Sequence, residues 1–273
     1  MIDYLFFPNP IFARKATTII NDGWWFSFDT KDWHKINVPF CPESKLSGIG
    51  YTDFIPQCFY KKQLDICKTD KRIVIHFGAV DYRCNLHING KYVGSHVGGY
   101  TPFEFDITDY LVDGKNELLL TVFDNEQRRA PTGKQSYKQK SFGCFYTRTT
   151  GIWQDVWLEK VPEKRIKQFY FYPNIEDGFT VDLITNGCGK VKIEVFFNRK
   201  LVGSFCGEIE YRKKIEITLS EKHLWELGKG NLYDVVLTFE DDVVYSYYGL
   251  REVSFKGFEF LLNGKKNLSK ISS

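Results

Sequence analysis

The chain has 273 residues, of which 43% are hydrophobic and 26% are charged, a balance typical of folded globular proteins. A formal net charge of +3 and 17% aromatic residues exclude a polyanion-binding protein driven by bulk charge, and also an intrinsically disordered chain. No apolar run is long enough for a membrane-spanning helix, and the N-terminus lacks the basic and apolar regions of a secretory signal. We therefore expect no membrane partner.

Apolar and polar residues alternate along most of the chain. The alternation is clear at residues 72–77, 83–88, 190–196, 215–219 and 235–239. A period of two over such short segments predicts strands with one buried face. Asn89-Gly90 follows one of these segments, and Asn198-Arg199 holds a comparable place in the second half, so each pair is predicted to close a hairpin.

Two pairs of tryptophans give local predictions. Trp24 and Trp25 are consecutive, so on a strand they point to opposite faces, and only one of them can enter the core. Trp153 and Trp157 are four residues apart, so on a strand they share a face. We expect the second pair to belong to one core.

Many short strands with few helical segments predict an all-β protein built from antiparallel sandwiches. A predicted strand at 152–160 ends just before Pro162, and a new aromatic strand begins at residue 166. We therefore predict a jelly-roll sandwich at residues 1–160 and an immunoglobulin-like sandwich at residues 161–256, with residues 257–273 outside both.

The seven cysteines are irregularly spaced, and none form a Cys-x-x-Cys pair. This pattern fits neither a disulfide framework nor a zinc site, so we expect reduced thiols in a cytoplasmic protein. No motif of a serine hydrolase, a phosphate-binding loop or a metalloprotease is present, and we predict no metal ion or other cofactor.

Several segments are more specific than generic β-structure. In order along the chain they read DGWWFSFD (22–29), VPFCPES (38–44), HFGAVDY (76–82), INGKYVG (88–94), GGYTPFEFDIT (98–108) and TGIWQDVWLE (150–159). In this order and spacing they resemble the N-terminal sugar-binding domain of glycoside hydrolase family 2, which contains β-galactosidases, β-glucuronidases and β-mannosidases. The segments NLYDV (231–235), YGLREV (248–253) and FLLNGK (260–265) resemble the end of the family's immunoglobulin-like domain and the hairpin that follows it.

The resemblance implies a galactose-binding-domain-like jelly roll, an immunoglobulin-like sandwich and, at 257–273, the start of a linker to a catalytic (β/α)₈ barrel. The family's acid/base and nucleophile glutamates lie on that barrel, so no residue of this chain inherits a catalytic role. The expected function is that of the non-catalytic N-terminal part of a retaining glycosidase that hydrolyses O-glycosyl bonds. It would shape the active site and support the oligomer and the barrel, which is present in cis or in trans, and it would be inactive alone.

Two loops are expected to approach the sugar by their position in the family motifs, namely residues 41–44 and the long segment 125–150. The residues expected nearest to a carbohydrate are Glu43, Asp81, Tyr146 and Arg148. The longer loop is basic, but it carries no repeated stacking platform, so nucleic acid is not an expected partner.

Two alternatives remain open from the sequence. The chain would act as a free-standing carbohydrate-binding module if it bound sugars in isolation. It would act as a structural or dimerisation module if its main partner were a second copy, in a homo-oligomer.

Overall fold

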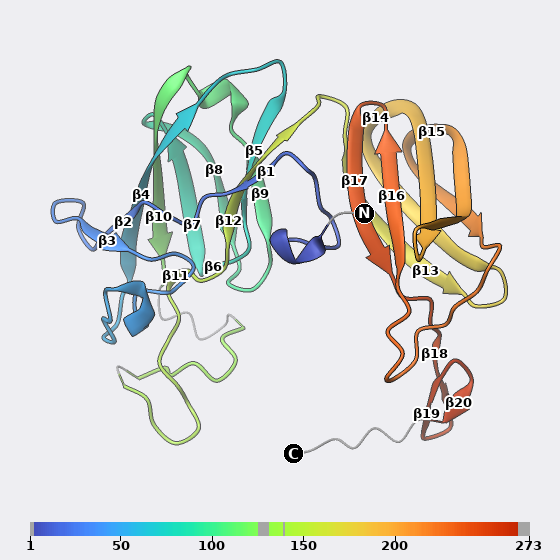
Figure 1. Ribbon diagram of the computed structural model, residues 1–273. Coiled ribbons are helices and arrows are strands. Elements are labelled where there is room, and N and C mark those ends of the chain that lie inside the picture. Colours follow the sequence, from blue (N-terminus) through green and yellow to red (C-terminus); the bar gives the residue numbers. More distant parts are fainter. Residues whose placement is uncertain (1–2, 125–130, 139, 267–273) are drawn as a thin grey trace. The chain divides into compact units, whose positions relative to one another are not determined.

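The computed structural model describes residues 3–124, 131–138 and 140–266, and these fold into antiparallel sheets joined by loops (Figure 1). They form two compact units, which are Ala16–Val161 and the segment through Lys15 together with the chain from Pro162. Helical structure in the described residues is limited to the 3-10 turns η1 (Tyr4–Phe6), η2 (Lys45–Ser47) and η3 (Thr108–Tyr110). None of the helical segments described has the length and apolar character needed to cross a bilayer.

The Ala16–Val161 unit is a sandwich of two antiparallel sheets (Figure 1). The smaller sheet has the order β1 (Thr17–Ile19), β12 (Val156–Val161), β5 (Arg72–Phe77) and β9 (Phe103–Asp106). The larger has the order β3 (His34–Ile36), β2 (Trp24–Ser27), β4 (Gln57–Ile66), β10 (Gly114–Phe123), β7 (Arg83–Ile88) and β8 (Lys91–Val97). A short pair, β6 (Val80–Asp81) and β11 (Gly151–Ile152), lies beside them.

One hydrophobic core joins the two sheets of this unit. It contains Ile75 and Phe77 of β5 together with Tyr60, Leu86 and Leu120 of the larger sheet, all fully buried. These residues occupy the alternating apolar positions of their strands, so the period of two determines which face is buried.

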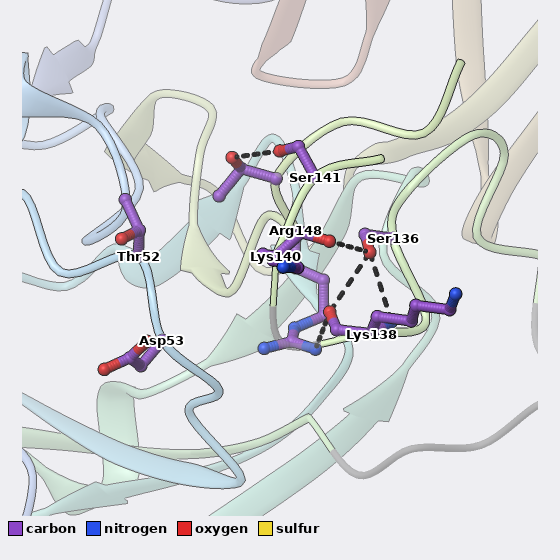
Figure 2. Close-up of a pocket in the computed structure, with 8 residues that line it drawn as sticks. Thr52, Asp53, Ser136, Lys138, Lys140, Ser141 and Arg148 are labelled. Atoms are coloured by element: carbon purple, nitrogen blue, oxygen red, sulfur yellow. Dashed lines mark hydrogen bonds between the residues drawn. The ribbon is translucent and has the colours of Figure 1, made fainter. Parts of the chain in front are cut away.

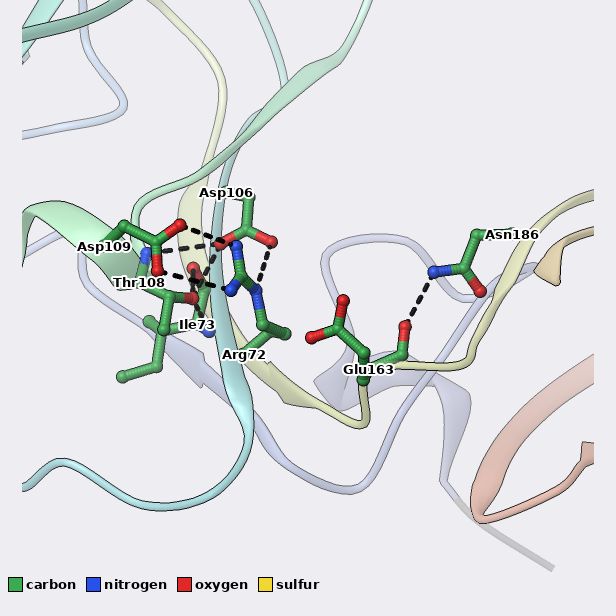
Figure 3. A network of polar contacts seen from close by, with 7 residues as sticks. All are labelled: Arg72, Ile73, Asp106, Thr108, Asp109, Glu163 and Asn186. Atoms are coloured by element: carbon green, nitrogen blue, oxygen red, sulfur yellow. Dashed lines mark hydrogen bonds and ion pairs between the residues drawn. The ribbon is translucent and has the colours of Figure 1, made fainter.

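An arginine ties the ends of two strands in the smaller sheet (Figure 3). Arg72 at the start of β5 donates from Nε to Asp106 over 2.9 Å and from Nη2 to Asp109 over 3.1 Å. The hydroxyl of Thr108 donates to Asp106 over 2.6 Å. The network fixes η3 against the sheet at the exit of β9.

The second unit is built on one long bent sheet. Its order is β13 (Ile166–Asn174), β14 (Gly178–Phe197), β16 (Tyr233–Phe239) and β17 (Asp242–Tyr248), and β15 (Lys200–Thr218) also pairs with β14. The register of β14 against β15 shifts between Ile184 and Cys188, and β13 pairs before this point whereas β16 pairs after it. Val181 and Ile193, on either side of the shift, enter one core, so the sheet folds on itself into a sandwich. A three-stranded sheet of β18 (Val253–Lys256), β19 (Glu259–Leu262) and β20 (Lys265–Lys266) follows.

The N-terminal segment packs with this second unit, whereas the sequence placed it in the domain 1–160. Ala13 forms an antiparallel bridge with Tyr245 of β17. The buried Arg14 donates from Nε and Nη2 to the two carboxylate oxygens of Asp242, each over 2.9 Å, and from Nη2 to the carbonyl of Ile166. The segment joins this unit because it covers the open edge of β17 and supplies the only side chain seen to form an ion pair with Asp242 in the described residues.

The predicted all-β fold of two sandwiches is confirmed, as are several local features. Asn89 and Gly90 have φ values of 51° and 75° in the β7–β8 turn, and Asn198 and Arg199 have 47° and 69° in the β14–β15 turn. Both hairpins therefore use the left-handed conformation that such two-residue turns need.

The tryptophan predictions are half right. Trp24 is 1% exposed and Trp25 is 38% exposed, so the two do face opposite ways. The shared core of Trp153 and Trp157 is wrong, because β12 begins only at Val156. Trp153 lies outside the strand and donates to the carbonyl of Gly99, whereas Trp157 stacks on His76.

Candidate carbohydrate-contacting site

The candidate site lies where the Ala16–Val161 unit leaves β10 and re-enters a sheet at β11. Asp124 directly follows β10, and Thr150 directly precedes β11. We call the described residues 131–138 and 140–150 between these strands the 131–150 loop. The rest of the predicted 125–150 loop lies outside the described residues. Asp81 pairs with Gly151 across β6 and β11, so the end of the loop is adjacent to a predicted site residue.

Thr150 anchors the end of the loop through two carboxyl groups. Its hydroxyl donates to Oδ2 of Asp124 over 3.0 Å, and its backbone N–H donates to Oε2 of Glu43 over 3.2 Å. Thr150 is fully buried, and Glu43 is 8% exposed. Glu43, which the sequence placed near a sugar, therefore lies beneath the loop and supports it.

Gln135 forms the second anchor. Its amide nitrogen donates to Oδ2 of Asp81 over 3.0 Å and to the hydroxyl of Tyr100 over 3.1 Å. Its amide oxygen accepts from the backbone N–H of Thr149 over 2.9 Å. Asp81 is only 6% exposed, so it too supports the loop from below.

Two glycines let the backbone approach these anchors closely. A Cβ on Gly99 would lie 2.6 Å from Cγ of Asp81, and a Cβ on Gly151 would lie 2.2 Å from the hydroxyl oxygen of Tyr60. Gly151 also has a φ of 77°, a conformation that residues with a side chain rarely adopt. The backbone thus covers the Asp81 carboxylate and the Tyr60 ring at van der Waals distance.

Burial and the charges of two neighbouring acids disfavour the ionisation of Asp124 beneath the loop. Burial, followed by the charge of Asp81, raises the pKa of Asp124 to about 7, and the charge of Glu43 adds to this while Arg148 opposes it. Burial also raises the pKa of Glu43 and that of Asp81. A low-dielectric site with several carboxylates favours their protonated forms. The base of the loop is therefore sensitive to pH.

Above this base the loop forms a polar pocket of about 260 Å³ (Figure 2). The guanidinium of Arg148 stacks on the ring of Phe54, with 4.2 Å between its carbon and the ring centroid, and it donates to the carbonyl of Lys138 over 3.3 Å. The pocket is lined by Thr52, Asp53, Ser136, Lys138, Lys140, Ser141, Thr147 and Arg148.

Tyr146 lies on the exposed side of the loop. It is 52% exposed, and its backbone is held on both sides, donating to the carbonyl of Lys134 and accepting from the N–H of Ser136. A Cβ on Gly133 would lie 3.5 Å from the hydroxyl of Tyr146 and 3.7 Å from that of Tyr100. The two phenol groups therefore flank the same glycine at the surface.

The structure separates the four predicted site residues into two groups. Glu43 and Asp81 are buried anchors, whereas Tyr146 and Arg148 belong to the accessible side of the loop. Sequence reasoning missed Asp124, whose carboxyl feels the charges of the other two acids, and it missed Gln135 and Thr150, which hold the loop. One signal in the sequence could have found Asp124. It directly follows the alternating segment of β10 and stands at the entrance to a long loop. Contact of any of these residues with a sugar stays a prediction.

The clustered carboxyl groups do not form a metal site. In the part of the chain that the structure describes, no three His, Cys, Asp or Glu side chains are arranged to hold a metal ion. Their oxygens accept instead from Thr150 and Gln135.

Comparison with known proteins points to one family. Residues 50–162 match the domain described as "Glycosyl hydrolases family 2, sugar binding domain". The chain is 28% identical to a β-galactosidase of Thermoanaerobacter pseudethanolicus, over 97% of this chain and 36% of the relative. It is 26% identical to a putative β-glucuronidase of Formosa agariphila, over 98% of this chain and 35% of that protein. The chain thus spans about a third of the length of these relatives.

Solved structures agree on the fold. A β-glucuronidase of Ruminococcus gnavus superposes with a TM-score of 0.74 at 19% identity, over 93% of this chain and 49% of that one. A putative β-galactosidase of Bacteroides fragilis superposes with a TM-score of 0.72 at 18% identity, over 92% of this chain and 43% of that one. Both alignments include both β-units, since each covers more than nine-tenths of the chain. The chain is related to the N-terminal region of glycoside hydrolase family 2, and residues 50–162 belong to the family's sugar-binding domain.

Proposed function

We propose that the chain is the non-catalytic N-terminal part of a family 2 glycosidase, which supports a catalytic domain in cis or in trans and contacts the sugar through the 131–150 loop. The family match and the similarity to glycosidases over nearly the whole chain support this assignment. The observation that carries it is the loop itself, whose exposed aromatic and polar side chains are held from below by buried carboxyl groups.

The geometry of the carboxyl groups argues against catalysis by the chain alone. A retaining glycosidase places two carboxyl groups about 5–5.5 Å apart on either side of the scissile bond. Glu43 and Asp81 are each less than a tenth exposed, and they accept hydrogen bonds from Thr150 and Gln135. Carboxyl groups that are covered by backbone and used to hold a loop cannot flank a glycosidic bond. The working carboxylates would come from the catalytic domain.

The accessible side of the loop has groups that suit a sugar. The rings of Tyr100 and Tyr146 are 47% and 52% exposed, and an aromatic face packs against the C–H face of a pyranose. Arg148 supplies fixed N–H donors for ring hydroxyls or a carboxylate. These side chains would complete a subsite whose other wall is the catalytic domain.

The test measures hydrolysis of chromogenic β-galactosides and β-glucuronides by the chain alone and with a family 2 catalytic domain added as a separate polypeptide. We expect no hydrolysis by the chain and a gain when the two are mixed. Tyr146→Ala should reduce this gain, whereas Tyr92→Ala, which removes a tyrosine of similar exposure on β8, should not. Hydrolysis by the chain alone that disappears in a Glu43→Gln, Asp81→Asn double variant would refute the proposal.

A free-standing carbohydrate-binding module is the second candidate. The two exposed tyrosines that flank Gly133 favour it, since they would be available to a ligand without a second domain. Calorimetric titration of the isolated chain with methyl β-galactoside and methyl β-glucuronide, combined with the mixing experiment above, distinguishes the two. Binding in the millimolar range or tighter without any gain of hydrolysis on mixing supports the module, and flat titrations at millimolar sugar exclude it.

A further inference from the structure

The pocket of the 131–150 loop carries an excess of positive charge. Lys138, Lys140 and Arg148 line it, and among the described residues of the lining Asp53 is the one acidic side chain. Within the described residues, no ion pair is found for any of these three cations. The ammonium of Lys138 lies over the ring of Phe142, 4.2 Å from its centroid, and in Figure 2 it points away from Arg148. The cations left to the pocket of about 260 Å³ are therefore Arg148 and Lys140, whose like charges repel one another, and a bound anion would relieve that repulsion.

Arg148 is held ready for such an anion. Stacking on Phe54 and donation to the carbonyl of Lys138 fix the plane of its guanidinium. A guanidinium has five N–H donors. In the described structure Arg148 donates one hydrogen bond, to the carbonyl of Lys138, so its other N–H groups are available to a ligand. In Figure 2 the group points across the pocket toward Asp53. A fixed planar fork of this kind matches the oxygen pair of a carboxylate or sulfate.

The hydroxyl groups of the lining suit a saccharide. Ser141 and Thr147 share one hydrogen bond of 3.1 Å, so one of their two hydroxyl hydrogens remains available to a ligand. Thr52 adds a further exposed hydroxyl on the side of Asp53 (Figure 2). Each hydroxyl both donates and accepts, as the hydroxyls of a sugar require.

We propose that this pocket binds an oxyanion carried on a saccharide, either the carboxylate of a uronic acid or a sulfate ester, with Arg148 as its main contact and Lys140 as a supporting charge. The inference rests on the proposed function, because it names the sugars that the 131–150 loop selects. Asp53 opposes the anion and limits its affinity.

The experiment titrates the full chain, followed by calorimetry, with four probes: methyl β-glucuronide, glucose 6-sulfate, methyl β-glucoside and sodium sulfate. Tighter binding of either anionic sugar than of the neutral sugar and of inorganic sulfate supports the proposal, and the two anionic sugars distinguish carboxylate from sulfate ester. The affinity should fall as salt is raised, because Lys140 is exposed and Arg148 is only half-buried. Equal binding of neutral and anionic sugars, binding of inorganic sulfate as tight as that of glucose 6-sulfate, or no binding of any probe overturns it.

Variants make the assignment specific. Arg148→Gln should weaken binding of the anionic sugar by about tenfold or more, as loss of a charge-assisted contact does. Arg251→Gln is the matched control, since Arg251 also stacks on an aromatic ring, that of Trp225, but lies in the other unit. Asp53→Asn should tighten binding by about threefold or more, because it removes the acidic charge found in the described lining. Unchanged affinity in Asp53→Asn contradicts the proposal even if Arg148→Gln fails to fold.

The two hypotheses fail in different ways. If mixing with a catalytic domain restores hydrolysis but anionic and neutral sugars bind alike, the proposed function stands and the oxyanion pocket is wrong. If the anionic sugars bind selectively but no catalytic domain is activated, the pocket stands and the chain is a free-standing module.

Discussion

The hydroxyl of Thr150 donates to Asp124 over 3.0 Å and so joins the residue that ends the 131–150 loop to the residue that follows β10. This hydrogen bond connects the end of β10 to the start of β11, so the two ends of the loop are held together. Because Thr150 also donates to Glu43, one buried threonine connects the loop to two of the three carboxyl groups beneath it. The position of the exposed side chains of the loop therefore depends on groups that are buried beneath it.

Stability should depend on pH through Asp124. The pKa of this group is raised from 3.8 to about 7, so between roughly pH 4 and pH 7 the folded chain binds a proton that the unfolded chain has lost. The contribution of Asp124 to the free energy of unfolding is therefore largest below pH 4 and is lost as the pH rises toward 7. Asp124→Asn, which cannot ionise, should be more stable than the parent chain at pH 8, by up to about 4 kcal/mol, and about equal to it at pH 4.

Urea denaturation of both proteins at pH 4 and pH 8 checks this. Asp106→Asn is the control, and its stability relative to the parent chain should change with pH in the opposite direction. The reason is that hydrogen bonds from Thr108 and Arg72 outweigh burial and lower the pKa of Asp106. That variant should lose stability at pH 8 and lose less at pH 4. If the free energies of unfolding of both variants, relative to the parent chain, changed in the same direction between pH 4 and pH 8, the raised pKa of Asp124 would be contradicted.

Gly151→Ala should destabilise the chain through contact as well as strain. The new Cβ would lie 2.2 Å from the hydroxyl oxygen of Tyr60 at a φ of 77°. Gly90→Ala is the matched control, with a φ of 75° and no atom within 4 Å of the new Cβ. Since strain alone costs about 1 kcal/mol and overpacking a core adds about 1–3 kcal/mol, thermal denaturation should show a clearly larger loss for Gly151→Ala. Adding Tyr60→Phe should restore part of it.

Gly99→Ala should displace Asp81 from Gln135. A Cβ placed 2.6 Å from the carboxyl carbon forces that side chain or the backbone of residues 98–100 to move. We expect a loss of about 1–3 kcal/mol in the free energy of unfolding and altered fluorescence of Trp153, which donates to the carbonyl of Gly99. Gly187→Ala, whose Cβ meets nothing closer than 3.9 Å, should leave both measurements nearly unchanged.

The ion pair of Arg14 and Asp242 should contribute strongly to the second unit. Both side chains are buried, and Asp242 also accepts from the backbone N–H of Ile166. Arg14→Met leaves a buried carboxylate without its partner, which costs about 3–5 kcal/mol. Lys200→Ala breaks an exposed pair with Glu221 and should leave the unfolding midpoint nearly unchanged. A small effect of Arg14→Met on urea denaturation would show that the segment is not needed for stability.

Much of the fold is encoded locally and could be predicted. The alternation around Ile75 and Leu86 identifies the buried faces, and Asn89-Gly90 fixes a hairpin through its own backbone preferences. Trp153 shows the limit of this reasoning, since the period of two holds only within a strand and β12 begins three residues later.

The candidate site was less accessible to sequence reasoning. Asp81, Asp124 and Gln135 come together only when β6, β10 and the loop are assembled, and no periodicity within the loop reports this. The resemblance to a family indicated this region of the chain as the expected sugar contact. It could not distinguish a buried anchor such as Glu43 from an exposed residue such as Tyr146, because burial is decided by segments distant in sequence.

The docking of Arg14 onto Asp242 has a consequence for how the protein is made. A ribosome releases the first fifteen residues well before their binding surface, so these residues must wait while Ala16–Val161 is synthesised and has the opportunity to fold. An expression clone that starts at Pro162 would omit the peptide covering β17, and one that stops at Val161 would leave that peptide with nothing to cover. Permuting the gene, so that the first fifteen codons follow those for the rest of their own unit, would deliver both parts together.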